Sequence, residues 1–465
     1  MKKAYSLLIS YVIFFSAICL LAILISCKDE EDGIHLPDFN GSNDTLQDDT
    51  PFADVPNTSD IIMYEINERA FSASGDFAGI TDRLDSISSL GVNVIWLMPV
   101  HPIGEINSVN SPYCVKDYKD INPEYGDLGD LRALVREAHN QGMAVILDWV
   151  ANHTSWDNDW IQNKSWYTQD AEGNIIYPAG TNYEDVADLN YDNAEMRLEM
   201  IEAMKYWIIK ANIDGYRCDA ADYVPYSFWS EAIEALQELP DRDIILLAEG
   251  ARVDHLDAGF QMIFSWDFYN KSKNVFENGQ SAKGFYQTHR NEYNNIPEGL
   301  HRLRFTSNHD ECAWDDTPLG IFGGMDASIA AFVITSYMGG VPLIYNGQEV
   351  GCPDKLPFFS NLPIDWSINP DMFHEYKMIL GIRNSNIALR SGALEDFSSD
   401  DIVAFTRKSP DNEVLVLVNT RNETIIFEFP LNIQNTTWQY AINDTSVTLN
   451  SAIVLYAFDY HIFKK

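Results

Sequence analysis

The segment LRALVREAHNQGMAVILDWV, residues 131–150, joins a helical pattern to a strand-length apolar run. Its first twelve residues are amphipathic and end on Gly142, a residue that commonly terminates helices. The run MAVILDWV (143–150) that follows is almost continuously apolar. Strands of parallel sheets have this composition because helices bury them on both faces. The segment therefore indicates an α/β fold in which helices and buried strands alternate.

The same unit recurs along most of the chain. Eight strand-length apolar runs occur, mostly separated by helical patterns, at 61–66, 92–100, 143–150, 213–219, 243–250, 261–268, 301–310 and 341–349. An eightfold alternation predicts an α/β fold of the closed (β/α)₈ type, a TIM barrel. An open doubly wound sheet is the alternative, but no glycine-rich phosphate loop follows the first run.

Two regions lie outside this alternation. A long aromatic and polar insertion, residues 153–193, follows the third predicted strand, and insertions of this length in compact domains are usually functional. Residues 391–465 are rich in short β patterns and turn residues, which predicts a C-terminal all-β sandwich domain. The predicted catalytic barrel then occupies residues 58–390.

The N-terminal residues have the composition of an export signal. Lys2 and Lys3 precede an apolar run that extends to Ile25, and the run ends in LISC. This ending resembles the lipobox of bacterial lipoproteins, so we expect a signal peptide over residues 1–26 and lipidation of Cys27. An uncleaved membrane anchor is the alternative.

The residues that follow indicate where the protein is placed. Residues 28–33, KDEEDG, resemble an acidic tag that directs some Gram-negative lipoproteins to the outer face of the cell, although an ordinary charged linker has the same composition. We therefore expect an outer-membrane lipoprotein, on the cell surface or the periplasmic face. Residues 27–57 are predicted to be a flexible acidic tether.

The charge balance restricts the possible partners. The chain of 465 residues carries 31 Lys and Arg against 69 Asp and Glu, a net charge of −38. Such a surface repels nucleic acids and anionic lipids, so we expect no nucleic-acid partner and membrane contact only through the lipid anchor. A neutral sugar or a divalent cation remains compatible, and the acidity also serves solubility. No CxxC spacing is present, which argues against a zinc site.

Three acids stand at the ends of different predicted strands, where barrel enzymes carry their chemistry: Asp219, Glu249 and Asp310. Any one of them alone would be read as a helix cap. Arg217 lies two residues before Asp219, on the same face of an extended strand, and is expected to lower the pKa of its carboxyl group. Glu249 follows an apolar run, which favours its protonated form. One ionised and one protonated carboxyl group are what a retaining glycosidase requires.

Several motifs around these acids resemble one enzyme family. DWVANH (148–153), GYRCDAAD (215–222), AEG (248–250) and TSNHD (306–310) resemble the conserved boxes of the α-amylase superfamily of glycoside hydrolases. Four further stretches resemble the family and occur in its order: SPYCVKDYKDINPEYG, VADLN, GVPLIYNGQE and LPIDW. The resemblance covers about residues 60 to 390.

The resemblance implies a role for each matching acid. Asp219 would be the nucleophile, Glu249 the general acid and base, and Asp310 the residue that holds the sugar 2- and 3-hydroxyls. Arg217 would orient Asp219 and keep it charged.

The resemblance also implies substrate contacts beside these acids. His153 and His309 would hydrogen-bond the sugar at the cleavage subsite, and Tyr113 would stack on its face. Asp148 is expected to support the site from beneath.

The chain departs from the family pattern at two places. Many starch-cleaving members carry Lys and His where this chain has Asp222 and Tyr223. Gly250 stands where an aromatic or aliphatic residue usually follows the catalytic Glu.

The resemblance gives a metal expectation, and the strand order gives a disulfide expectation. Asn152 and Asp188 match positions that ligate calcium in the family, and their oxygens suit Ca²⁺. Cys312 and Cys352 follow neighbouring strands, which allows a disulfide. The alternative is that these two, together with Cys114 and Cys218, are buried free thiols.

These observations favour a retaining hydrolase of α-glucosidic bonds, most readily α-1,4 bonds in starch-like glucans or maltooligosaccharides. An α-glucan transglycosylase or isomerising relative would use the same covalent intermediate and is an alternative. A non-catalytic glucan-binding surface lipoprotein is a third, and the intact Asp219, Glu249 and Asp310 argue against it.

Overall fold

The computed structural model describes residues 50–465. The predicted signal peptide, Cys27 and most of the predicted tether lie outside the described residues. The described chain begins before the predicted barrel start, and the ring of Phe52 stacks on His139 with centroids 4.5 Å apart. Between residues 50 and 465, no helix combines the length and the apolar character needed to cross a bilayer.

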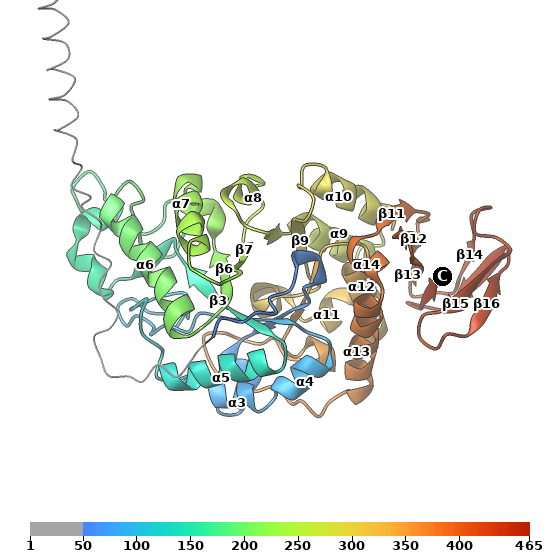
Figure 1. Ribbon diagram of the computed structural model, residues 1–465, viewed down its shortest axis with the longest axis horizontal. Coiled ribbons are helices and arrows are strands. Elements are labelled where there is room, and N and C mark those ends of the chain that lie inside the picture. The colour runs from blue at the N-terminus through green and yellow to red at the C-terminus, as the bar shows by residue number, and fades with distance from the viewer. Residues whose placement is uncertain (1–49) are drawn as a thin grey trace, which may run out of the picture. The chain divides into compact units, whose positions relative to one another are not determined.

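Eight parallel strands close into a barrel (Figure 1). The strand order is β1-β10-β9-β8-β7-β6-β3-β2, and β1 pairs with both β2 and β10, which leaves the sheet without an edge. The strands are β1 Met63–Ile66, β2 Val94–Leu97, β3 Ala144–Val150, β6 Gly215–Asp219, β7 Ile245–Ala248, β8 Met262–Phe264, β9 His301–Arg304 and β10 Val341–Tyr345. The barrel prediction is confirmed, and the doubly wound alternative is excluded.

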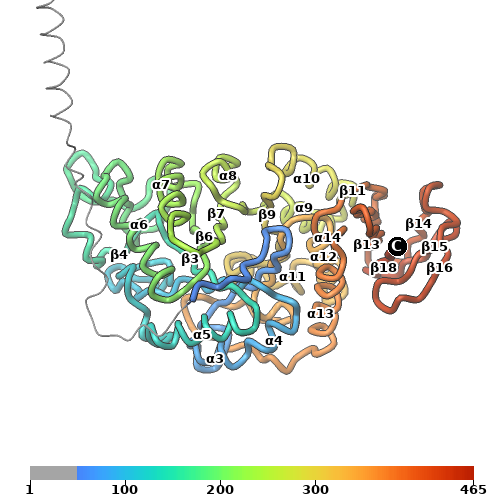
Figure 2. The backbone as a smooth tube through the Cα atoms, viewed as in Figure 1, coloured from blue at the N-terminus to red at the C-terminus, as the bar shows by residue number. Residues whose placement is uncertain are grey.

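Helices cover the outside of this barrel, as the backbone path shows (Figure 2). In α5, an Asp127–Asp130 capping box fixes the first turn, and the apolar side chains face the core. The longer helices are α5 Leu128–Asn140, α6 Ala194–Lys210, α7 Tyr226–Gln237, α9 Trp266–Phe276, α10 Gly284–Tyr293, α12 Met325–Tyr337 and α13 Pro370–Ser385. The shorter ones are α2 Glu68–Phe71, α3 Phe77–Thr81, α4 Leu84–Ser89, α8 Asp254–Ala258, α11 Pro318–Phe322 and α14 Ile387–Ser391. Single turns add η1 Thr58–Asp60, η2 Asp159–Gln162, η3 Lys164–Trp166, η4 Ala221–Tyr223, η5 Glu311–Asp315 and η6 Gln348–Val350.

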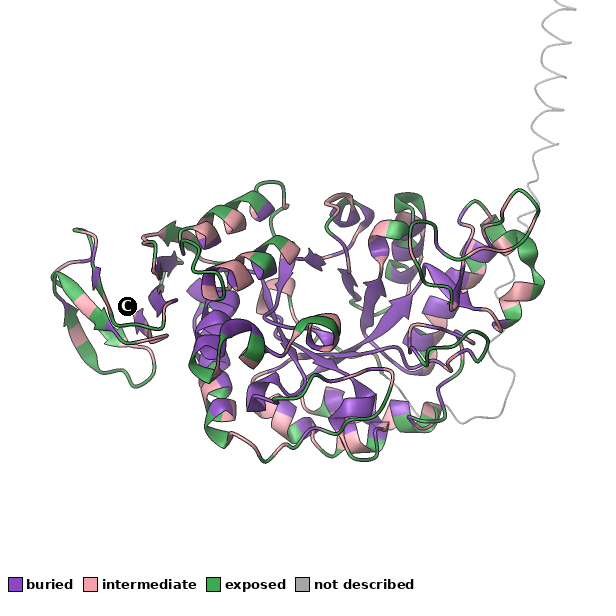
Figure 3. Ribbon diagram, turned by 180° about the vertical axis from the view of Figure 1, so that it is seen from behind, coloured by how far each residue is buried: buried purple, intermediate pink, exposed green. Residues whose placement is uncertain are grey.

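The barrel strands are buried on both faces (Figure 3). In β3, Val145 and Leu147 join the core between strands and helices, whereas Ala144 and Ile146 join the core inside the barrel. This alternation explains why the strand sequences read as continuous apolar runs. It also turns Asp148 toward the barrel interior, on the same face as Ile146.

The insertion after β3 forms a small antiparallel ribbon. Strands β4 His153–Ser155 and β5 Val186–Asp188 pair with each other and place His153 opposite Asp188. The ribbon thus fixes the loop that reaches over the barrel mouth.

The C-terminal region is an antiparallel β structure. Its main sheet has the order β11-β12-β13-β18-β15-β16, and β14 pairs with β17 beside it. The strands are β11 Ala393–Asp396, β12 Ile402–Lys408, β13 Glu413–Asn419, β14 Ile425–Glu428, β15 Thr436–Tyr440, β16 Ser446–Leu449, β17 Ala452–Leu455 and β18 Tyr460–Lys464.

Both faces of this main sheet are covered. Val403 and Phe405 of β12 belong to the large core that also contains the barrel helices, while Ile402 and Ala404 pack in a core of the C-terminal region itself. Buried Arg407 donates hydrogen bonds to the main-chain oxygens of Met338 (2.8 Å) and Ala388 (3.1 Å) on the barrel side.

Candidate active site

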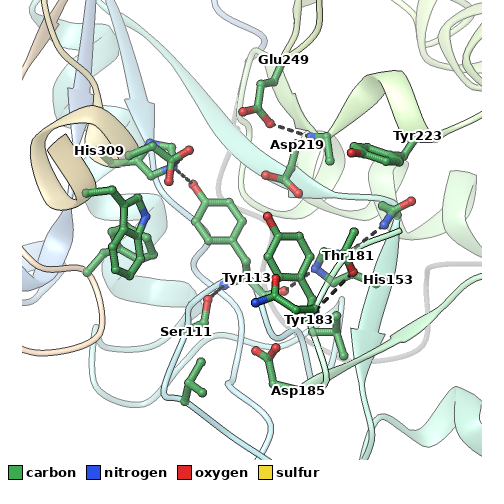
Figure 4. Close-up of a pocket in the computed structure, with 18 of the residues that line it drawn as sticks. Ser111, Tyr113, His153, Thr181, Tyr183, Asp185, Asp219, Tyr223, Glu249 and His309 are labelled. Atoms are coloured by element: carbon green, nitrogen blue, oxygen red, sulfur yellow. Dashed lines mark hydrogen bonds and ion pairs between the residues drawn. The ribbon is translucent and has the colours of Figure 1, made fainter. Parts of the chain in front are cut away.

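The predicted site residues meet at a cavity of about 540 Å³ at the carboxyl ends of the barrel strands (Figure 4). Asp219, Glu249 and Asp310 line it from three different strand ends. The predicted sugar-contacting residues Tyr113, His153 and His309 line it too, and so does Asn152. Chain segments far apart in sequence converge here because the carboxyl ends of all eight strands face the same end of the barrel.

Arg217 lies beneath the cavity and binds three carboxylates. Its Nη1 contacts Asp148 Oδ1 at 2.6 Å and Asp219 Oδ1 at 3.0 Å, and its Nη2 contacts Glu249 Oε2 at 3.0 Å. The guanidinium is buried, so each contact forms in a low-dielectric setting. The Arg217–Asp219 pair was expected, and so was the place of Asp148 below the site. The bridge to Glu249 was not.

The pKa of Asp219 moves in the opposite direction to the sequence expectation. Burial raises the pKa of this carboxyl group, Arg217 lowers it, and the carboxylates of Glu249 and Asp148 raise it again, with a net rise. The expectation considered only the arginine. Arg217 is nevertheless the cation that favours the charged form, so the nucleophilic state of Asp219 depends on it.

Glu249 has more polar surroundings than its sequence suggested. Its Oε2 accepts a 2.7 Å hydrogen bond from the amide of Ala220 as well as the contact from Arg217. The expected apolar environment belongs to β7, whose residues are buried in the core, whereas the carboxyl group lies just past Ala248, the last residue of the strand. Ala220 adopts a left-handed conformation with φ 45°, which costs on the order of 1 kcal/mol for a residue with a Cβ. That conformation accompanies the hydrogen bond from its amide to Glu249.

His309 is held as a cation between two acids. Its Nδ1–H donates to Glu65 Oε1 at 2.5 Å, while its Nε2 lies 2.8 Å from the Tyr113 hydroxyl and 3.5 Å from Asp310 Oδ2. Burial lowers the pKa of His309, but Asp310 and Glu65 raise it, to about 9 overall. Burial raises the pKa of Glu65, and His309 lowers it by less than burial raises it.

Glu65 was missed in the sequence. It is fully buried in β1, inside an apolar run that gave no motif. The available signal was the run itself: an acid within a buried strand needs a cationic partner.

His153 differs electrostatically from His309. Its Nε2 lies 3.2 Å from the carbonyl oxygen of Tyr113, and its Nδ1 lies 3.2 Å from the side-chain nitrogen of Asn152. Burial lowers the pKa of His153 to about 4, so its imidazole is neutral. The two histidines therefore present one neutral and one charged ring to the cavity.

Tyr113 is held by its hydroxyl group. The hydroxyl donates to Asp148 Oδ2 at 2.9 Å, and the ring stacks on His309 with centroids 5.4 Å apart. The ring is only half-buried and lines the cavity, so its stacking on a sugar stays a prediction.

The calcium positions supply few ligands. Asn152 contacts His153, and Asp188 lies opposite His153 in the β4–β5 ribbon; burial raises the pKa of Asp188. Across residues 50–465, no three or more His, Cys, Asp or Glu side chains form a group that could hold a metal ion. Calcium takes six to eight oxygen ligands. Two oxygen-bearing side chains supply only part of that set, so calcium binding at Asn152 and Asp188 stays a prediction.

The four cysteines in the described part of the chain, Cys114, Cys218, Cys312 and Cys352, are buried free thiols. Cys312 and Cys352 share one apolar cluster with Leu356 and Ile364 but form no disulfide. The disulfide that the sequence allowed is therefore absent from this structure, and the alternative reading holds.

Comparison with known proteins agrees with this geometry. Residues 38–174 and 162–379 match the family described as alpha amylase, catalytic domain, which is most of the chain. The chain belongs to the alpha-amylase family. It is an α-amylase-type glycoside hydrolase.

Relatives of this family member support the assignment. Alpha-amylase 3 of Dictyoglomus thermophilum is 28% identical over 440 residues, covering 79% of this chain and 86% of that protein. The crystal structure of an alpha-amylase from Lactobacillus plantarum superposes with a TM-score of 0.78 at 26% identity, covering 88% of this chain and 99% of that one. The noncanonic maltogenic alpha-amylase AmyB of Thermotoga neapolitana gives 0.79 at 25% identity, with the same coverage of 88% and 99%.

Proposed function

We propose that the protein is a retaining hydrolase that cleaves α-1,4-glucosidic bonds in starch-like glucans or maltooligosaccharides. The observation that carries the proposal is the contact of Asp219 and Glu249 with the two terminal nitrogens of one guanidinium, Arg217. These nitrogens share one carbon atom, so the two carboxyl groups lie close together. Retaining enzymes need a short separation, whereas inverting enzymes need room for a water molecule between the acids.

The proposed reaction starts from an ionised Asp219 and a protonated Glu249. Because the amide of Ala220 and Arg217 both contact Oε2 of Glu249, we assign the transferable proton to Oε1. Asp219 attacks C1 of the sugar while the bond from C1 to the leaving oxygen breaks and Glu249 protonates that oxygen. Water then attacks C1 of the resulting ester, gives its proton to Glu249 and releases Asp219 as a carboxylate.

The other cavity residues position the sugar in this scheme. Asp310, with its side chain 38% exposed, is available to accept hydrogen bonds from two sugar hydroxyls. Neutral His153 and charged His309 both line the cavity and supply further hydrogen-bonding groups. Arg217 compensates the negative charge of Asp219 and keeps it reactive despite its burial.

The test is a product analysis with anomeric resolution. Amylose, maltotriose, pullulan, sucrose and trehalose are incubated with the enzyme, and the products are followed by chromatography and proton NMR. We expect α-anomeric maltooligosaccharides to be released first from amylose. Initial β-anomers would exclude the retaining mechanism, and products formed only by sugar transfer or isomerisation would favour a transglycosylase or isomerase.

One variant distinguishes the proposed hydrolase from a glucan-binding protein without catalytic activity. Asp219→Asn is expected to abolish turnover while glucan binding persists. Turnover equal to that of the parent would show that Asp219 is not the nucleophile.

We also propose that the enzyme is exported and anchored as an outer-membrane lipoprotein. The support is the LISC ending, the KDEEDG stretch and the polar composition of the residues after them. Replacement of Cys27 by Ser should abolish incorporation of labelled fatty acid and release the enzyme from the membrane fraction. Retention of the label in that variant would refute lipidation at Cys27.

A further inference from the structure

The loops that follow β6 and β7 stay joined beyond the ends of these strands. The strand register ends at the pair Cys218–Ala248. The amide of Ala221 then donates to the carbonyl of Glu249 at 2.9 Å. Beyond that bond the side chain of Asp222 connects the two loops. Its carboxylate accepts hydrogen bonds from the amide of Ala251 at 3.1 Å and from the amide of Arg252 at 3.4 Å.

Asp222 is held in this position from two sides. The Nε2 of fully buried His255 contacts its Oδ1 at 2.8 Å, and Arg252 Nη1 donates to its main-chain oxygen at 2.8 Å. Burial raises the pKa of Asp222, but the hydrogen bonds from His255 and the two amides lower it by a larger amount. The net pKa is below its usual value, so the group is a carboxylate. The side chain thus links the loop after the nucleophile to the loop after the general acid.

Gly250 is part of the same arrangement. A Cβ at this position would lie 2.4 Å from Asp222 Oδ1 and 3.0 Å from His255 Nε2, which is too close for either atom to stay in place. The glycine therefore makes room for the carboxylate. The two departures from the family pattern, at Asp222 and at Gly250, are one structural feature, and that feature lies directly beside Glu249.

We infer that Asp222 is a positioning residue for the general acid, holding the loop 249–252 so that Glu249 remains on the amide of Ala220 and on Arg217. The inference rests on the proposed role of Glu249. Loss of Asp222 would let the loop move and carry the carboxyl group away from the leaving oxygen. A displacement of about 1 Å at a catalytic group lowers rates by about 100-fold.

The test compares two substrates that differ in their need for a proton. A maltooligosaccharide has a poor leaving group that must be protonated, whereas fluoride leaves α-maltosyl fluoride without protonation. The measured quantity is kcat/KM, which reports the step that forms the glycosyl-enzyme ester. For Asp222→Ala we expect a loss of about 10- to 100-fold on the oligosaccharide and a much smaller loss on the fluoride.

Three further variants make the result interpretable. Asp222→Asn keeps one of the two oxygens that accept from the amides of Ala251 and Arg252, and it should show a weaker split between the substrates. In Gly250→Ala the new Cβ would displace the Asp222 carboxylate from its place. This variant should therefore reproduce the split between the substrates although Asp222 itself is unchanged. Asp254→Asn is the matched control, because Asp254 begins α8 just after the loop, its side chain is 47% exposed, and its ion pair is with Arg252 Nε and not with Asp222. It should leave both rates unchanged.

Each outcome decides the inference. Equal losses on both substrates in Asp222→Ala and Gly250→Ala, or no loss in either, would overturn it, because a purely structural role does not distinguish leaving groups. Glu249→Gln serves as the reference and should show the largest split. If Glu249→Gln shows none, the proposed function fails instead.

Discussion

Replacement of Glu65 by Gln should change the charge state of His309 without altering the shape of the site. Glu65 is one of two carboxylates that face His309, and Asp310 is the other. The Tyr113 hydroxyl also contacts the ring, and Arg217 lowers the pKa of His309. The amide of Gln still accepts the hydrogen bond from Nδ1 but no longer supplies a negative charge.

The expected magnitude follows from the pKa of His309. A rise from 6.5 to about 9 corresponds to about 3 kcal/mol in favour of the imidazolium, at roughly 1.4 kcal/mol per pKa unit. Because the pKa of His309 is raised in the folded state, this contribution is fully present below pH 6.5 and is lost as the pH rises through about 9. Because burial and Arg217 lower the pKa of His309, the two carboxylates together contribute more than the net rise, so Glu65→Gln should lower this pKa by about one unit or more.

The assay is the pH dependence of kcat/KM on maltooligosaccharides, from about pH 6 to pH 10. We expect the alkaline limb to move down by about one pH unit in Glu65→Gln, with the rate near pH 6 almost unchanged. Glu68→Gln is the matched control: Glu68 is equally buried just after β1, and burial raises the pKa of its carboxyl group, but the carboxylates that raise the pKa of His309 are Asp310 and Glu65. An alkaline limb at the parent position in Glu65→Gln would refute the assignment of His309 as the group held charged by Glu65.

Three further outcomes are expected. Asp219→Asn should lower kcat on the order of 10⁴-fold or more. It should also raise the apparent melting midpoint at pH 7, because the raised pKa of Asp219 means that its carboxylate destabilises the fold at high pH. A calorimetric gain in stability that does not shrink on acidification would contradict this direction of the pKa shift. Trp314→Ala removes a 67% exposed ring from the cavity wall and should raise KM for glucans by roughly 2- to 10-fold with an unchanged melting midpoint; an unchanged KM would exclude sugar stacking there. If calcium binds at Asn152 and Asp188, EDTA should lower the melting midpoint of the parent but not of Asp188→Asn, and a midpoint indifferent to EDTA would remove the calcium prediction.

The eight barrel strands were readable from the sequence because burial on both faces leaves only one composition for such segments. Asp219, Glu249 and Asp310 were readable for a related reason, since the carboxyl ends of parallel strands share one end of the barrel. Periodicity and strand order were enough for both inferences.

The contacts between these acids and their neighbours were not readable. Arg217 contacts Asp148, its register partner on the neighbouring strand β3, and Glu249 just past the end of β7. Along its own predicted strand, Asp219 is the acid that shares its face. Glu65 meets His309 across 244 positions of sequence.

The predicted direction of the pKa shift of Asp219 was wrong for the same reason. Two effects raise this pKa: burial in the packed barrel, and the charge of the acids that the fold brings together around Asp219. Neither effect can be inferred from the residues next to Asp219 in the sequence.

The double coverage of the C-terminal sheet bears on how the chain is divided. Val403 and Phe405 complete the core of the barrel helices, and Arg407 satisfies carbonyl groups at the ends of α12 and α14. A barrel truncated near residue 390 would expose that apolar face and leave those carbonyls without their partner. The catalytic and C-terminal parts should therefore unfold together in one cooperative transition, and a shortened enzyme made for crystallisation or secretion needs the sheet as much as it needs the active site.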